Sequence, residues 1–321
     1  MKPLHKQSGV ALITAILLVA IATTLATKLL WDNQLSMRRT ETMLSQEQAR
    51  HFATGGEAIA IEFMREDDVA FDHPSEGWGQ PLGPIEIGIE ELIMGQMQGA
   101  LTDAQSRFNL NNLVPARGSP PDPRAREQFE ELIGLLKLEP AIVDSVIDWI
   151  DEDTVPEPLG AEDGTYTALD PPYRAANNYL TSVTELRAIA NIDEEAYELL
   201  RPYVTAIHPT WCGAQGGVLP INLNTAPAEV IQSLHPSIST GDAESWVEER
   251  GETGWENWNE VTNWPADLQS MQGTEVSLGT NCFEANVLVN IGSSVLSMYS
   301  LLDRSGGADQ ILVRSRTLGL E

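Results

Sequence analysis

The chain has 321 residues, and its 47 acidic and 19 basic side chains give it a formal net charge of −28. A field of that sign repels phosphate, which argues against nucleic acid and anionic lipid head groups as partners. With 42% hydrophobic residues, the chain is long enough to bury the cores of two domains.

An apolar segment lies near the N-terminus. No charged side chain occurs from Ser8 to Thr27, a stretch of roughly 30 Å as a helix, which is about one hydrocarbon thickness. Lys2 and Lys6 precede this segment, and such a charge bias keeps a short N-terminus in the cytoplasm while the remainder crosses. We therefore expect a single pass through a membrane.

Three interpretations of this segment compete. It is a secretory signal peptide cut near Ala20-Ile21-Ala22, a plain signal anchor, or a pilin-like leader that is cut before the apolar run and leaves that run on the mature chain. No Gly or Pro interrupts residues 10–50, and apolar residues keep recurring at helical spacing beyond the membrane. This favours the third interpretation and predicts one long helix over residues 10–67, with a flaw at Gly55-Gly56.

The stretch KQSGVALIT resembles a prepilin-peptidase site. Five further segments follow in the order typical of K-type minor pseudopilins of type II secretion systems: ARHFATGGEAIAIEF, SRFNLNNLV, DWIDEDTVPEPLGAEDGTY, PPYRAANNYLTSVTELRAI and INLNTAP. The chain therefore resembles this family over almost its whole length.

The resemblance implies cleavage after Gly9 by prepilin peptidase, with Val10 as the N-methylated new N-terminus. The fifth mature residue is then Thr14, where most pilin-like subunits carry a glutamate. That glutamate is thought to pair with the terminal ammonium of a neighbouring subunit, since a carboxylate buried in lipid is costly when unpaired. A chain that lacks it is compatible with the top of a filament, where no subunit lies above.

The resemblance also implies a place and partners. The bulk would be periplasmic, anchored in the bacterial inner membrane, at the tip of the filament that drives folded exoproteins outward. The I- and J-type minor pseudopilins would bind it, and the H-type minor and G-type major pseudopilins are further candidates. The alternative is a membrane-anchored periplasmic binding module that recognises a ligand or nucleic acid through a helix-hairpin-helix-like repeat.

The expected fold class is α+β: a pilin-like long helix on an antiparallel β-sheet, with a large, mostly α-helical domain of SAM-like, helix-hairpin-helix-like layout inserted in the sheet.

Apolar and β-branched runs predict strands, and helical spacing predicts helices. The predicted strands are 84–89, one or two within 97–110, 286–291, 295–299 and 310–313. The predicted helices are 124–136, 141–150, 184–190, 193–204, 226–234 and 242–249. The expected divisions are leader 1–9, membrane half 10–30, periplasmic half 31–67, first β part 68–114, helical insert 115–273 and final strands 274–321.

A weak repeat supports the helical layout. FNLNNL at residues 108–113 and INLNTA at residues 221–226 share an apolar-Asn-Leu-Asn pattern, and a helix is expected after each. Helix-hairpin-helix modules bind DNA through a glycine-rich hairpin, but the corresponding stretch here contains Pro236, which removes a backbone donor, and lacks the glycine pair. Together with the net charge, this argues against DNA binding.

The densest polar cluster runs from Asp148 to Asp163 and contains seven carboxylates. It is either a solvated acidic loop or a cation site, and calcium suits flexible loops of carboxylate and carbonyl oxygens better than magnesium does. No His or Cys lies nearby, which argues against zinc. Resemblance to the family, whose helical domain binds calcium, favours a Ca²⁺ site, and the ligands we expect are Asp151, Asp153, Glu162 and Asp163. Asp148 is expected to orient the loop from its helix.

Two cysteines, Cys212 and Cys282, would lie in an oxidising compartment, so we expect a disulfide between them. The histidines are scattered and form no triad-like order with a Ser or Cys. We therefore expect an assembly subunit and not an enzyme.

Overall fold

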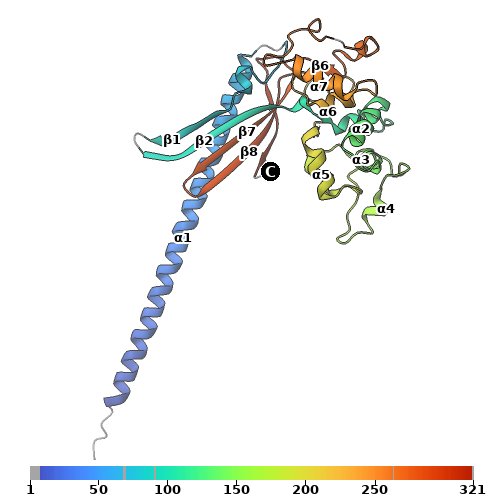
Figure 1. Ribbon diagram of the computed structural model, residues 1–321. Coiled ribbons are helices and arrows are strands. Elements are labelled where there is room, and N and C mark those ends of the chain that lie inside the picture. The colour runs from blue at the N-terminus through green and yellow to red at the C-terminus, as the bar shows by residue number, and fades with distance from the viewer. Residues whose placement is uncertain (1–7, 68–69, 90–91, 263, 320–321) are drawn as a thin grey trace, which may run out of the picture.

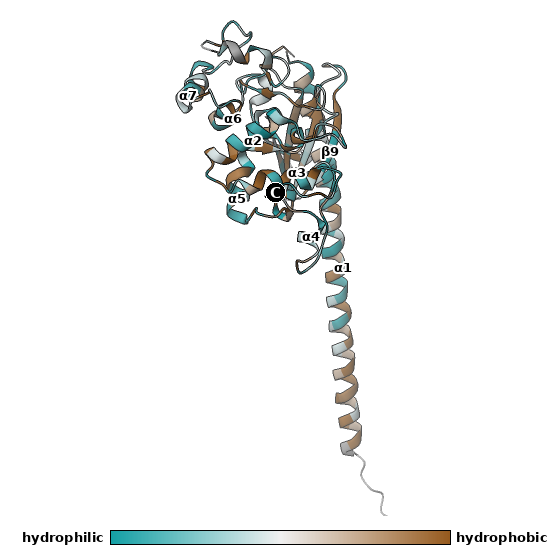
Figure 2. Ribbon diagram, turned by 90° about the vertical axis from the view of Figure 1, so that its right-hand side faces the viewer, coloured by the Kyte–Doolittle hydropathy of each residue, from teal (hydrophilic) through white to brown (hydrophobic). Residues whose placement is uncertain are grey.

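The computed structural model describes residues 8–67, 70–89, 92–262 and 264–319. Its longest element is α1 (Ser8–Arg65), one unbroken helix of 58 residues that extends far beyond the rest of the molecule (Figure 1). Within the described residues it is the one helix long and apolar enough to cross a membrane, with a window of mean hydropathy 2.4 in which nothing is buried. Figure 2 shows this apolar half as the brown, free end of the helix. The predicted single long helix is confirmed.

The upper half of α1 lies on a five-stranded antiparallel sheet of order β1-β2-β7-β8-β9. The strands are β1 (Leu82–Ile89), β2 (Leu92–Asp103), β7 (Cys282–Ile291), β8 (Ser294–Asp303) and β9 (Leu312–Leu318). Because β2 pairs with β7, the sheet joins two parts of the chain that are far apart in sequence, as predicted. The expected α+β class with a helical insert is confirmed.

All five strands differ from their expected bounds by a few residues, and two of these differences have a clear cause. β2 is a single long strand whose weak periodicity follows from its glycines: a Cβ on Gly95 would lie 2.0 Å from the carbonyl oxygen of Asn290 on β7. β9 begins within the predicted strand 310–313 but continues to Leu318. Its later residues are mostly polar and exposed, because β9 is an edge strand, so they carry no apolar signal.

Two adjacent residues fix α1 on the sheet. Gly56 is needed because a Cβ there would lie 2.7 Å from Cγ1 of Val287 on β7, so α1 can approach the sheet closely at that point. Next to it, Glu57 is buried, and its carboxylate accepts hydrogen bonds from Ser300 Oγ at 2.6 Å and from Arg316 Nε and Nη2 at 2.7 and 2.8 Å. A charge-assisted, bidentate pair thus ties the helix to β8 and β9.

The chain between β2 and β7 forms the helical insert, which lies to one side of the sheet (Figure 1). Its α-helices are α2 (Pro123–Leu135), α3 (Ala141–Ile150), α4 (Asp163–Tyr166), α5 (Glu194–Leu200), α6 (Ala228–Ser233) and α7 (Thr240–Glu249). The 3₁₀ segments of the described chain are Gly77–Gly79, Ala104–Ser106, Leu110–Leu113, Val183–Ala188, Arg201–Tyr203 and Ala266–Met271. Short parallel pairs join β3 (Phe108–Asn109) to β4 (Val204–Thr205), and β5 (Ile221–Asn222) to β6 (Val276–Ser277).

The insert contains two hydrophobic cores. One gathers buried side chains between Phe108 and Val204, and the other gathers those between Ile221 and Leu278. Each core begins at one copy of the apolar-Asn-Leu-Asn pattern. The domain limits at residues 115 and 273 stay predictions; in the structure β2 ends at Asp103 and β7 begins at Cys282.

Three expected helices are shorter than predicted, and one of them is α6, which covers only Ala228–Ser233 of the expected 226–234. The stretch expected as a helix at 184–190 is the 3₁₀ segment Val183–Ala188, opened by a capping box of Ser182 and Glu185. The helix expected at 193–204 ends at Leu200, because the chain must turn to place Val204 beside Phe108 in the β3–β4 pair.

We predict that Glu57→Gln lowers the free energy of unfolding at pH 7 by about 1–3 kcal/mol, because it removes the charge that Arg316 pairs with. Burial alone would raise the pKa of Glu57, but the hydrogen bonds from Arg316 and Ser300 outweigh it and leave the pKa below its ordinary value of 4.5. The stabilisation is therefore complete above pH 4.5 and is lost as the pH falls through the lowered pKa. Denaturant unfolding from pH 7 to pH 3 measures it.

The matched control for this experiment is Glu62→Gln, on the same helix, where the carboxylate forms only an exposed pair with Arg65. It should change stability by less than about 0.5 kcal/mol. Equal effects of the two substitutions, or a Glu57→Gln effect independent of pH, would contradict the prediction.

Candidate metal centre

The acidic loop between α3 and α4 is held from α3 by two buried carboxylates, one turn apart. Asp144 Oδ2 accepts a hydrogen bond from the Leu159 N–H at 3.0 Å, and Asp148 Oδ1 accepts one from the Glu157 N–H at 3.0 Å. Gly160 lies directly against Asp148, since a Cβ on Gly160 would be 1.9 Å from its Oδ2. Asp148 thus orients the loop from its helix, the role expected for it.

Three carboxylates of this loop converge. Asp151, Asp153 and Glu162 each place one oxygen within 4.8 Å of the others. Both oxygens of Glu162 and Oδ1 of Asp151 are buried and accept no hydrogen bond. A buried anionic oxygen without a donor is costly, so this arrangement calls for a positive charge at its centre.

The crowding of these carboxylates also raises the pKa values of two of them. Burial, followed by repulsion from Asp153 and Asp148, raises the pKa of Asp151 to about 6. Burial, followed by repulsion from Asp148 and Asp151, raises the pKa of Glu162 to about 7. Both carboxyl groups therefore hold their protons to a higher pH than ordinary carboxyl groups do, and a cation at the centre would favour their ionised forms.

Two arginines in this region pair with acids outside the group of three. Arg117 pairs with Glu152, and Arg126 pairs with Asp144 and Glu157. Among the residues that the structure describes, no Lys or Arg forms an ion pair with the three converging carboxylates. The cluster thus has no internal counter-charge, unlike its neighbours.

The fourth predicted ligand, Asp163, lies outside this group of three. Its Oδ1 accepts a hydrogen bond from the Ala175 N–H at 3.1 Å, and its Oδ2 lies 3.7 Å from Arg174. The structure thus brings together Asp151, Asp153 and Glu162, while Asp163, the first residue of α4, holds the following loop. The assignment of ligands stays a prediction.

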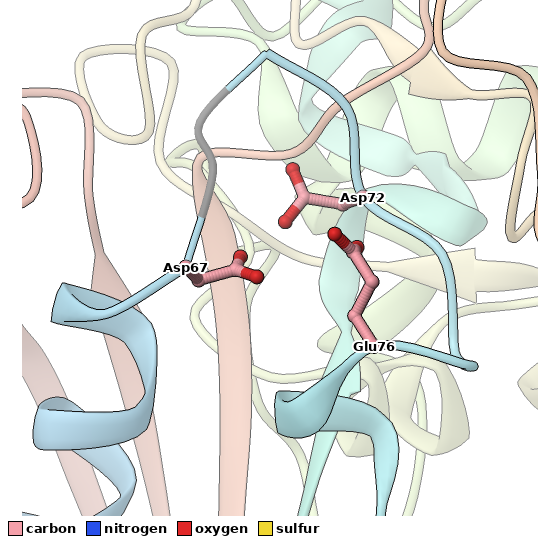
Figure 3. A group of neighbouring side chains, drawn as sticks. All are labelled: Asp67, Asp72 and Glu76. Atoms are coloured by element: carbon pink, nitrogen blue, oxygen red, sulfur yellow. The ribbon is translucent and has the colours of Figure 1, made fainter.

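A second group of acids was not anticipated from the sequence. Asp67 at the end of α1 converges with Asp72 and Glu76, and Figure 3 shows their carboxylates pointing toward one another. This group has its own cation: the fully buried Arg304 donates from Nη1 to Asp67 at 2.7 Å and from Nη2 to both oxygens of Asp72 at 2.6 and 2.7 Å. We therefore assign it as a structural ion-pair network. No local signal links Arg304 to acids more than 200 residues earlier in the chain.

The asparagines of the repeated pattern are structural. Asn109 and Ile207 exchange two hydrogen bonds, from the Asn109 side chain to the Ile207 carbonyl at 3.0 Å and from the Ile207 N–H back at 2.9 Å. In the second copy Asn224 makes the same exchange with Trp255, at 2.9 and 2.8 Å. These buried amides take the place of backbone partners for loops that enter each core.

The expected disulfide between Cys212 and Cys282 is present, with Cα atoms 5.2 Å apart. It joins the segment between the two helical cores to the first residue of β7. Beside it, Asp303 Oδ2 accepts hydrogen bonds from the Cys212 N–H at 2.9 Å and from Arg314 Nε at 2.8 Å.

At the N-terminal end, residues 1–7 of the expected leader, with Lys2 and Lys6, lie outside the described residues, while Gly9 and Val10 lie in the first turn of α1. The hydroxyl of Thr14 donates to the carbonyl oxygens of Val10 at 3.1 Å and Ala11 at 3.0 Å. Its polar group is therefore satisfied within its own helix, which suits an apolar environment.

Comparisons with known proteins agree with one another. Two family models described as "Type II secretion system (T2SS), protein K" match residues 106–209 and 221–280, and these ranges follow the two cores of the insert. A type II secretion system protein K of Pseudomonas aeruginosa is 33% identical, covering 98% of this chain and 93% of that protein. One of Aeromonas hydrophila is 28% identical, covering 98% and 97%. A chain in the crystal structure of the GspK-GspI-GspJ complex of enterotoxigenic Escherichia coli matches with a TM-score of 0.72 at 25% identity, covering 88% of this chain and all of that one.

Proposed function

This chain belongs to the type II secretion system protein K family, and on that premise we propose that it is the minor pseudopilin at the tip of the filament that exports folded proteins. The similarity covers nearly the full length of both this chain and its Pseudomonas aeruginosa relative, so it includes the long helix as well as the insert. The role is one of assembly, and we assign the chain no catalytic step.

The observation that carries the tip position is Thr14. A carboxylate at this depth in a membrane requires a partner of opposite charge, whereas the Thr14 hydroxyl finds both acceptors on its own helix. The chain therefore offers no buried anion for the terminal ammonium of a subunit above it. The helical insert, placed to one side of the sheet, adds width at the end where a further subunit would stack (Figure 1).

The topology follows from α1. Its apolar half spans the inner membrane with the leader in the cytoplasm, and the sheet and insert lie in the periplasm. The disulfide between Cys212 and Cys282 is consistent with that oxidising compartment.

We propose the GspI- and GspJ-type minor pseudopilins as the partners of this chain, since a GspK chain of similar fold forms a complex with them. We predict that the full chain, extracted from membranes in mild detergent, co-purifies with these two subunits of its own system. Quantitative mass spectrometry of the purified complex measures it. Recovery of this chain without either subunit, under conditions that retain other pilin-like assemblies, would contradict the proposal.

We further propose that calcium occupies the acidic loop. Asp151, Asp153 and Glu162 supply hard anionic oxygens, of which Asp151 Oδ1 and both oxygens of Glu162 accept no hydrogen bond, and calcium takes six to eight oxygen ligands in flexible loops. When bound, the ion would supply the positive charge that the loop lacks and would fix the segment between α3 and α4. The Asp163 carboxylate would become a further ligand if it gave up its hydrogen bond from the Ala175 N–H and its contact with Arg174.

We predict that a chelator lowers the melting temperature of the protein by several degrees and that added calcium, but not magnesium, restores it, because metal binding stabilises the folded state by mass action. The double substitution Asp151→Asn with Asp153→Asn should abolish this response in differential scanning calorimetry. Glu195→Gln, an exposed acid on α5 of the same core, should keep it. An identical response in the two variants would refute the assignment.

We predict that N-terminal sequencing of the mature chain begins at Val10 in cells that contain prepilin peptidase, and at Met1 in cells that lack it. This result separates a filament subunit from a membrane-anchored binding module, which has no need of that enzyme. Cleavage near Ala22 in either strain would mean that α1 is lost on maturation and would overturn the proposed anchoring.

A further inference from the structure

The last residue of β2 is a buried acid, Asp103, that joins the sheet to the second core of the insert. Its Oδ1 accepts a hydrogen bond from the Gln105 N–H at 2.7 Å, and its Oδ2 accepts from Asn222 Nδ2 at 2.8 Å and from Thr225 Oγ1 at 2.5 Å. Among the residues that the structure describes, no basic side chain forms an ion pair with it. A buried carboxylate without a cation is costly, so this site favours the neutral carboxyl group.

A second buried aspartate, at the end of β8, shows what Asp103 lacks. The Oδ1 of Asp303 accepts a hydrogen bond from the N–H of Ser305, two residues later, at 2.8 Å, just as Asp103 accepts one from Gln105. Asp303 also pairs with Arg314 at 2.7 Å. Burial would raise the pKa of Asp303, but the hydrogen bonds that it accepts outweigh burial and lower it. At Asp103 burial prevails, and the pKa is raised.

Asn222 connects Asp103 to another buried acid, Asp72. The Asn222 amide nitrogen donates to Asp103 Oδ2 and, at 3.1 Å, to the backbone carbonyl oxygen of Asp72. Burial raises the pKa of Asp72 to about 8; Arg304 opposes this shift, and the charge of Asp103 adds to it. Two buried carboxyl groups that repel each other cannot both ionise at low cost. Asp72 is the better anion of the two, since Arg304 contacts both of its oxygens at 2.6 and 2.7 Å.

The basic side chains described around Asp103 have other partners. Arg304 pairs with Asp67 and Asp72, and Arg250 donates to two backbone carbonyl oxygens. Neither arginine therefore offsets the charge of Asp103. The other charged or titratable side chains of the region are His73 and Glu76 after α1, Arg107 after β2, and its partner Glu284 on β7.

The hydrogen bonds at Asp103 provide a place for one proton. The Thr225 hydroxyl oxygen lies 2.5 Å from Asp103 Oδ2 and 3.3 Å from the backbone carbonyl oxygen of Asn222. A hydroxyl group can both donate and accept. A protonated Oδ2 can therefore donate to Thr225, whose hydroxyl then rotates to donate to the Asn222 carbonyl. The neutral form of Asp103 is thus fully hydrogen-bonded without any movement of the backbone.

We propose that Asp103 is protonated in the folded chain at neutral pH, and that its ionisation at mildly alkaline pH loosens the contact between the sheet and the second core of the insert. The contact depends on Asp103 because its partners Asn222 and Thr225 lie at the start of that core. The inference does not depend on the proposed function.

The direction of the pH effect follows from linkage. In an open state, where water reaches the carboxyl group, Asp103 regains its ordinary pKa of 3.8, whereas in the closed state the pKa is raised by burial. For one proton, the equilibrium constant for opening then rises about tenfold per pH unit between these two values. The contact is therefore firmest at acidic pH, weakens as the pH rises, and weakens no further above the raised pKa.

Two matched amides in the unsubstituted chain test the loosening. Gln105 N–H donates to Asp103 Oδ1 and Ser305 N–H donates to Asp303 Oδ1, each from two residues further along the chain. From pH 6 to pH 8, the hydrogen-exchange protection factor of the Gln105 amide in the full chain in detergent should fall at least tenfold. That of the Ser305 amide should stay within twofold. A Gln105 protection factor that does not fall, or falls no more than that of Ser305, overturns the proposal.

Infrared spectroscopy tests which carboxyl group holds the proton, because a protonated carboxyl group and a carboxylate absorb at different frequencies. With calcium present, the full chain should lose a protonated-carboxyl band as the pH is raised from 6 to 9. Asp103→Asn should lack this band and should make Gln105 protection independent of pH, while the control Asp303→Asn should keep both signals. A band that persists in Asp103→Asn would place the proton elsewhere and overturn the assignment. If Asp103→Asn fails to fold, the comparison of the two amides in the unsubstituted chain still decides the proposal.

Discussion

The attachment of α1 to the sheet at Gly56 and Glu57 determines how the rest of the molecule is arranged. The lower half of α1 must present apolar side chains to lipid all round, so it can contribute nothing to folding in water. The upper half must therefore hold the helix to the sheet, and it does so by close backbone approach at Gly56 and by the buried Glu57–Arg316 pair.

The insert is a large domain that lies in the chain between β2 and β7, two strands that pair in the sheet. Its two cores are separate in sequence, and each is entered by a segment whose buried asparagines take over the hydrogen bonds of nearby loops. Where α1, β8 and the insert meet, the buried Arg304 neutralises Asp67 and Asp72. The acidic loop between α3 and α4 lies at the edge of the first core, and no Lys or Arg of the described chain pairs with Asp151, Asp153 or Glu162. The chain's excess of acid is thus neutralised by a side chain in the one place and by no described side chain in the other.

The sequence predicted those features whose signal is local. Helical spacing and the absence of Gly and Pro revealed α1, β-branched runs revealed β7 and β8, and the density of acids marked the loop of Asp151 and Glu162. The features that were missed depend on contacts between distant residues. The apolar alternation of β2 was weak because of its glycines, which are required only by the close approach of β7. Nothing in the sequence around Arg304 indicates which acids it pairs with. Asp163 was expected among the ligands, but α4 begins there and its carboxylate accepts a hydrogen bond from the Ala175 N–H.

The disulfide has a mechanical consequence. Without it, the insert would be joined covalently to the sheet by two stretches of backbone, one after Asp103 and one before Cys282, and its other attachments would be noncovalent contacts such as those of Arg304 and Asp303. The bond from Cys212 adds a third tether, away from the other two along the chain, in the segment between the two cores. Because its other end is Cys282, the bond keeps the segment that leads into the second core within one disulfide length of the first residue of β7. This part of the insert cannot separate from the sheet unless the bond is reduced.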